Sequence, residues 1–225
     1  MLLLGAESAP AHDGAHALPD SQRVRGSQAP GDDGALPLAY TLPAAGSYAL
    51  PAITRVGEHE LLDADGRPAR VPALAPGQVA VIAFVYLGCR DGSGCPLALA
   101  TLLRLDRALA ERADLAARVR LATVSFDPAR DRPAELARLR DGLAPRSDWR
   151  FLTAADEASL APVLADYGQD VDRLPGEGDA EPPALGHVLK VFLVDASGDV
   201  RNVYSAGFLD HRLVLRDVET LLMER

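Results

Sequence analysis

Residues 84–97 read FVYLGCRDGSGCPL and contain both cysteines of the chain. The continuous apolar run at residues 79–86 predicts a β-strand that is covered on both faces. Pro96 is well placed for the first turn of a helix. Leucines from Leu99 to Leu109 then recur at helical spacing. The stretch therefore predicts a buried strand, a loop that carries two thiols, and a helix that begins at the second thiol.

Cys89 and Cys95 are the two cysteines of the chain. On one continuous helix they would face about 120° apart and lie ~9 Å apart along the axis. A disulfide needs Cα atoms within roughly 7 Å, so the intervening loop must fold back, as Gly92 and Gly94 allow. At a helix N-terminus the dipole is expected to lower the pKa of the Cys95 thiol. A thiolate is both a nucleophile and a ligand for soft metals.

A simpler interpretation of the pair is two small buried residues or a passive disulfide. The position at the end of a strand, the glycine-rich loop and the absence of other cysteines disfavour it. If the pair binds metal, Cu(I) suits two thiolates and one imidazole. His187 is the candidate third ligand, because it precedes a predicted strand at 189–194 and follows a loop rich in Pro, Gly and acidic residues at 169–183. A structural histidine is the alternative. The other histidines are interpreted as solvated or surface residues: His12, His16, His59 and His211.

The composition excludes several classes of function. A net charge of −9 argues against a nucleic-acid binder, which would present a basic face. It also disfavours binding to anionic membrane surfaces. No apolar run approaches the roughly 20 residues of a membrane helix, and residues 1–4 are too short an apolar run for an intact signal peptide. Hydrophobic residues make up 48% of the 225 residues, enough for a substantial core.

The chain is predicted to consist of a flexible tail at residues 1–46 and one domain at residues 47–225. The tail is rich in Ala, Gly and Pro and buries too little to offset its ordering entropy. Strands separated by helices predict an α/β fold with a largely parallel sheet, helices on both faces and an antiparallel edge. Sites in such sheets lie at the carboxyl ends of strands, which is where Cys89 falls. The other predicted elements are a hairpin at 60–71, strands at 119–126, 149–152, 189–194 and 200–205, and helices at 133–143, 155–167 and 210–224.

Four segments along residues 50–225 form an ordered pattern. They are the strand and loop that end in Cys95-Pro96-Leu97, VSFDPARD at 124–131, WRFLT at 149–153, and His187 five residues before FLVD at 192–195. In this order they resemble the Sco/SenC family, thioredoxin-fold proteins of the periplasm or mitochondria that take part in copper delivery and cytochrome c oxidase assembly.

The resemblance implies a thioredoxin-like fold with a central mixed sheet, flanking helices and an N-terminal hairpin extension. It implies that Cys89, Cys95 and His187 bind copper, as Cu(I) or Cu(II), and that the two cysteines also act as a redox-active disulfide pair. The implied partners are a cuproprotein, such as the copper-site subunit of a respiratory oxidase, and a thioredoxin-like reductant. The implied location is periplasmic, free or tethered by a membrane anchor that is not in this sequence.

The chain departs from the family pattern at two points. Five residues separate the cysteines where the family has three, which alters disulfide strain and metal geometry. Gly186 stands where the family commonly has Asp, so a partner that orients the imidazole is expected to be missing. Asp127 and Asp131 match the acidic motif of the family, and we interpret them as caps of the turn into the next helix.

The alternative function is a thiol–disulfide oxidoreductase that reduces the cysteines of a copper-site partner. In that case His187 would be dispensable, whereas the two cysteines would exchange with a substrate dithiol. A thiol peroxidase is disfavoured because the Pro/Thr-containing peroxidatic motif is missing. A copper sensor or a structural binding module remains a further alternative.

Overall fold

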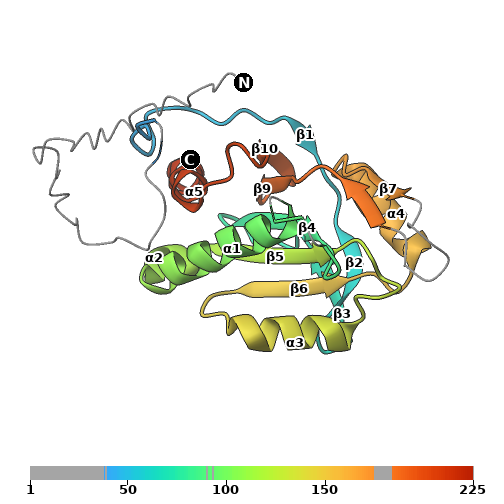
Figure 1. Cartoon of the computed structure of the whole chain (residues 1–225). Coiled ribbons are helices and arrows are strands. Elements are labelled where there is room, and N and C mark those ends of the chain that lie inside the picture. Colours follow the sequence, from blue (N-terminus) through green and yellow to red (C-terminus); the bar gives the residue numbers. More distant parts are fainter. Residues whose placement is uncertain (1–37, 39, 90, 93, 175–183, 225) are drawn as a thin grey trace, which may run out of the picture. The chain divides into compact units, whose positions relative to one another are not determined.

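The computed structural model describes residues 38, 40–89, 91–92, 94–174 and 184–224 (Figure 1). The described residues belong to one compact unit, Leu38–Arg225. Most of the predicted tail lies outside them, and the division at residue 46 stays a prediction. Among the described residues, no helix is both long enough and apolar enough to cross a membrane.

Among the described residues, the main sheet has eight strands in the order β1-β10-β9-β4-β5-β6-β2-β3, and β7 and β8 pair with each other in a second sheet. Five helices are described alongside them. The strands are β1 (Thr54–Arg55), β2 (His59–Asp63), β3 (Pro68–Val71), β4 (Val79–Val85), β5 (Val119–Ser125), β6 (Trp149–Thr153), β7 (Val171–Leu174), β8 (Ala184–His187), β9 (Val191–Asp195) and β10 (Asp199–Tyr204). The helices are α1 (Cys95–Ala110), α2 (Ala113–Ala116), α3 (Pro133–Leu143), α4 (Glu157–Asp166) and α5 (His211–Met223).

β4 is the central strand of the main sheet, and all seven of its residues are buried. It runs parallel to β5, which in turn runs parallel to β6. On its other side it is antiparallel to β9, and β9 is antiparallel to β10. This arrangement confirms the predicted mixed α/β sheet with an antiparallel edge. It also explains why the sequence of β4 is uninterruptedly apolar, because a strand paired on both sides and covered on both faces meets no water.

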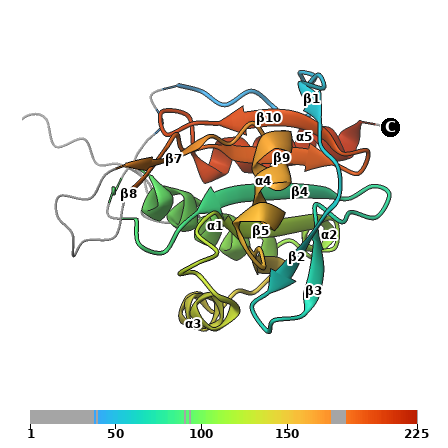
Figure 2. The same cartoon turned by 90° about the vertical axis from the view of Figure 1, so that its right-hand side faces the viewer.

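Helices cover both faces of the sheet. α1 and α5 pack against each other and against β4, while α4 lies across the opposite face (Figure 2). At the C-terminal end of α4, three aromatic rings meet edge to face, with centroids 5.1–5.8 Å apart: Phe84, Tyr167 and Phe192. These ring contacts attach the turn after α4 to the neighbouring strands β4 and β9.

The predicted N-terminal hairpin is present as β2 and β3. Gly66 takes a positive φ of +77° in its turn, and the Asp63 carboxylate accepts hydrogen bonds from the backbone N–H groups of Asp65 and Arg67. The hairpin joins the sheet because β2 pairs antiparallel with β6. It therefore extends the sheet at the edge farthest from β10.

The region between α4 and β9 differs from the prediction. The loop expected at 169–183 contains β7 at its start, and residues 175–183 lie outside the described part of the chain. β9 begins at Val191, two residues later than expected, and His187 belongs to β8 and not to the lead-in of β9. The four-residue strands β7 and β8 carry Asp, Arg and Gly without strict alternation, which is why the sequence gives no strand signal there.

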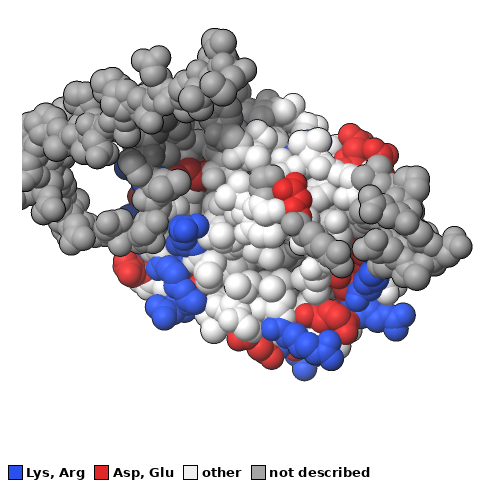
Figure 3. Space-filling view, viewed as in Figure 1, with Lys and Arg blue, Asp and Glu red and all other residues white. Residues whose placement is uncertain are grey.

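Charged side chains lie mainly around the margin of the face in Figure 3, with acidic and basic residues intermixed. Uncharged residues occupy the centre of this face. The net negative charge is therefore not gathered into one acidic patch among the described residues in this view.

Candidate metal centre

The two cysteines lie where β4 ends and α1 begins. After β4 the chain turns, and the Cys89 N–H donates to the Tyr86 carbonyl oxygen at 3.3 Å. The chain then folds back through a second turn, in which the Gly94 N–H donates to the Asp91 carbonyl oxygen at 3.0 Å. Cys95 is the first residue of α1 and is 2% exposed, whereas Cys89 is half-buried. These two turns fold the loop back on itself, as we predicted from Gly92 and Gly94.

His187 reaches the thiols from the last position of β8. Its Nδ1 lies 3.1 Å from the Leu185 carbonyl oxygen. A carbonyl only accepts, so Nδ1 carries the proton and Nε2 presents its lone pair. Nε2 lies 3.5 Å from Cys95 Sγ. The rings of Tyr86 and Phe126 flank the imidazole, with centroids 5.7 and 4.8 Å away.

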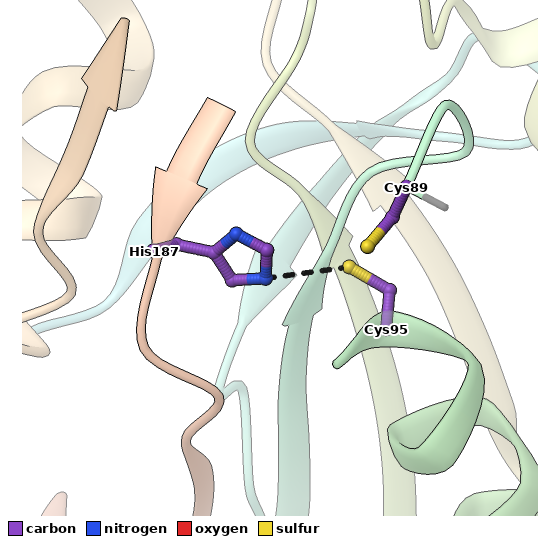
Figure 4. Close-up of side chains that lie close together, drawn as sticks. All are labelled: Cys89, Cys95 and His187. Carbon is purple, nitrogen blue, oxygen red and sulfur yellow. Dashed lines mark hydrogen bonds between the residues drawn. The ribbon is translucent and has the colours of Figure 1, made fainter. Parts of the chain in front are cut away.

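These contacts bring all three predicted residues together. The ligand atoms of Cys89, Cys95 and His187 all lie within 4.8 Å of one another (Figure 4). Metal–sulfur bonds of about 2.3 Å and metal–nitrogen bonds of about 2.0 Å would separate such atoms by up to ~4.6 Å around one ion. The group therefore fits a single metal ion after only a slight contraction, and its two sulfurs and one imidazole are donors that soft metals prefer.

A backbone carbonyl group orients the His187 imidazole, although position 186 is a glycine and carries no carboxylate. The resemblance led us to expect an imidazole without its orienting partner, but the Leu185 carbonyl takes that role. Gly186 pairs with Asp172 of β7, on the face of the hairpin opposite to that of its neighbour His187. A side chain at position 186 would thus point away from the thiols.

The expected lowering of the Cys95 pKa is wrong. Burial raises the pKa of this thiol to about 12, although a hydrogen bond from the Tyr86 N–H, 3.5 Å from Sγ, works in the opposite direction. Taking a thiolate out of water is costly, and at Cys95 this cost is larger than the stabilisation of the thiolate by backbone hydrogen bonds. A soft metal would displace this proton when it binds.

Asp131 has a role that the sequence did not suggest. Its carboxylate is 3% exposed and accepts hydrogen bonds from the Leu87 N–H at 2.9 Å and the Ser125 O–H at 2.7 Å. It therefore ties the start of the cysteine loop to the end of β5. The Asp127 carboxylate instead pairs with Arg130 at 2.8 Å. Neither carboxylate caps α3, contrary to our expectation, since the N-cap residue is Arg132 without a side-chain cap.

The two other histidines among the described residues, His59 and His211, do not join the cluster. His59 Nε2 lies 2.8 Å from the Asp166 carboxylate. His211 is 8% exposed at the start of α5, so its interpretation as a surface residue is wrong. His12 and His16 lie outside the described residues.

Comparison with known proteins agrees with the ordered pattern of motifs. The SCO1/SenC family model matches residues 50–223, which is most of the chain. The chain belongs to the SCO1/SenC family. No curated protein matched this SCO1/SenC chain.

Solved structures of SCO1/SenC proteins share the fold. Bradyrhizobium japonicum ScoI with copper bound is 23% identical, with a TM-score of 0.60 over 74% of this chain and 98% of that one. A SCO1/SenC family lipoprotein from Bacillus anthracis is 23% identical, with a TM-score of 0.63 over 77% and 99%. BsSco, described with a disulfide switch as a member of the Sco family of cytochrome c oxidase assembly proteins, is 20% identical, with a TM-score of 0.59 over 79% and 99%. These likenesses confirm the thioredoxin-like fold.

Proposed function

We propose that this SCO1/SenC protein binds copper through Cys89, Cys95 and His187 and passes it to a cuproprotein, such as the copper-site subunit of a respiratory oxidase. The observation that carries the proposal is the convergence of the three ligand atoms within 4.8 Å. The residue types support copper in particular, because two thiolates and an imidazole suit Cu(I). Copper is here the cargo, and the chain supplies the ligands that hold it.

The burial of the ligands suggests the order in which they are exchanged. Cys95 is buried, whereas Cys89 and His187 are half-buried and accessible to a docked partner. An incoming thiolate or imidazole would therefore replace an accessible ligand first, and Cys95 would release copper last. Such stepwise replacement never leaves the ion without ligands, which keeps the barrier to transfer low.

The test is a titration of the reduced protein with Cu(I) against a competing chelator. We expect Cys95→Ser to lower the affinity by more than about 100-fold and His187→Ala to lower it by about 10- to 100-fold. His59→Ala is the matched control, because His59 is paired with Asp166 outside the cluster. Unchanged affinity in both Cys95→Ser and His187→Ala would overturn the proposal.

The second candidate is a thiol–disulfide oxidoreductase acting on a copper-site partner, and the proximity of the two sulfurs favours it. Both cysteines are free thiols whose Sγ atoms lie within 4.8 Å. Their oxidation to one disulfide would give two electrons and two protons to a disulfide of the partner. The same variants separate the candidates: thiol exchange that survives His187→Ala, in a protein whose Cu(I) affinity none of the variants changes, would favour the redox function.

We further propose that the protein works outside the cytoplasm, in the periplasm or tethered to a membrane facing it. A solved relative from Bacillus anthracis is a lipoprotein, which supports this location. In this proposal residues 1–46 act as the tether and residues 47–225 as the copper-binding domain.

A further inference from the structure

Gln169 is a buried polar residue close to His187 in the fold. It lies in the turn after α4 and is 3% exposed. Its backbone is fixed, because its N–H donates to the Leu164 carbonyl oxygen at 2.8 Å. Its side-chain Nε2 donates to the carbonyl oxygens of Val188 at 3.1 Å and Asp170 at 3.3 Å. The amide therefore contacts the backbone of the residue that directly follows the proposed ligand.

The orientation of this amide is determined by its neighbours. Both oxygens near Nε2 belong to backbone carbonyls, which only accept, so the NH₂ group must face them. The opposite end, Oε1, is buried without a hydrogen-bond partner among the described residues. An apolar side chain of the same length would fill the space without leaving that oxygen unpaired. What the glutamine adds is its two donated hydrogen bonds, and the one to Val188 links the turn to a residue 19 positions further along the chain.

That hydrogen bond holds the chain where it crosses from the small sheet to the main sheet. His187 ends β8 and β9 begins at Val191, so the three residues between them carry the chain across. The Val188 side chain is 64% exposed and contributes little packing. A second bond to the same turn comes from Lys190 Nζ, which donates to the Gly168 carbonyl oxygen at 2.5 Å. Two hydrogen bonds therefore join the turn at residues 168–169 to the segment between β8 and β9.

We propose that Gln169 is a positioning residue that holds His187 against the two thiols through the backbone of Val188. The hydrogen bond from Gln169 is made to Val188, one residue from the proposed ligand, and neighbouring Cα atoms are only 3.8 Å apart. Without it, the imidazole would spend part of its time away from Cys95 Sγ. Apparent affinity falls in proportion to the competent fraction, so a tenfold loss of that fraction weakens copper binding tenfold.

The inference rests on the proposed copper function, so its first test is independent of copper. In the apo protein, the rings of Tyr86 and Phe126 should shift the NMR signals of the His187 ring protons. Gln169→Met keeps the length of the side chain and removes the donor, so we expect these signals to move towards the values of an unstructured histidine. Tyr167→Phe is the matched control in the same turn, because it removes a buried hydroxyl that has no hydrogen-bond partner in the described structure.

The second test is a double-mutant cycle on Cu(I) affinity. We expect Gln169→Met to lower the affinity of the wild-type background by about tenfold, and to change nothing in the His187→Ala background. Equal losses in both backgrounds would overturn the inference, since they would show a general structural effect. Unmoved His187 signals in Gln169→Met would overturn it too. If the signals move but His187→Ala leaves Cu(I) affinity unchanged, the positioning role stands and the copper ligand set fails.

Discussion

The two sides of the candidate metal centre rest on supports of very different strength. Cys89 and Cys95 follow β4, a wholly buried strand that pairs with β5 on one side and β9 on the other. His187 ends β8, whose described pairing is with β7 alone. An isolated two-stranded hairpin is marginally stable in water. We therefore infer that the thiols form the fixed part of the site and the imidazole the part that moves.

Each side is also tied down near its ligand by one buried polar side chain. Asp131 accepts from the N–H of Leu87, two residues before Cys89. Gln169 donates to the carbonyl of Val188, one residue after His187. The first tie uses a carboxylate with two donors, and the second uses one arm of a neutral amide. Hydrogen bonds to charged groups are stronger than those between neutral groups. The cysteine side is therefore also held by the stronger hydrogen bonds.

The largest expected difference is in amide hydrogen exchange. Amides of β4 should exchange only through global unfolding, because the strand is buried and paired on both sides. Amides of β8 should exchange through local opening, at least about 1000-fold faster. Exchange of the apo protein, followed by NMR or mass spectrometry, measures both. Equal protection of β4 and β8 would show that the small sheet is as firmly held as the main one, and the comparison would fail.

A large effect on stability is expected when the tie on the thiol side is removed. Asp131→Ala removes the acceptor of two donors, the partly buried Leu87 N–H and the buried Ser125 O–H, so it should lower the free energy of unfolding by about 3 kcal/mol. Denaturant unfolding of the reduced protein measures this.

Asp127→Asn provides the control for that change. It weakens an ion pair with Arg130, whose side chain is 39% exposed, and should cost less than about 1 kcal/mol. If Asp131→Ala cost no more than Asp127→Asn, the carboxylate would not be what supports the cysteine loop.

The sequence was most informative where residue types are rare and their neighbours apolar. With two cysteines in the chain, their position after an unbroken apolar run identified the strand, the loop and the helix together. His187 was predicted as a candidate ligand from its place relative to a motif, and the structure brings it to the thiols, but its own strand was not predicted. β7 and β8 escaped prediction because four-residue strands in a hairpin carry too little apolar periodicity.

The supporting residues and the thiol pKa depend on contacts that leave no local pattern. Leu87 and Asp131 are 44 residues apart in the chain, and Gln169 and Val188 are 19 apart. The helix start at Cys95 suggested a lowered thiol pKa because dipoles can be read from local sequence. Burial, which raises that pKa, comes from the packing of the whole domain around Sγ.

The smallest expected effect concerns Lys190, the single lysine of the chain. Its Nζ donates to the Gly168 carbonyl oxygen in a solvent-exposed hydrogen bond, so Lys190→Met should change the free energy of unfolding by less than about 0.5 kcal/mol. The bond nevertheless restrains the crossing from β8 to β9, so amide exchange at His187 and Val188 should rise about two- to threefold. Lys190→Arg keeps a donor and should stay close to wild type. An equal rise of the exchange rate at His187 and Val188 in both variants would show that the hydrogen bond to Gly168 is not the restraint. The hydrogen bond from Gln169 to Val188 would then be the remaining restraint on His187.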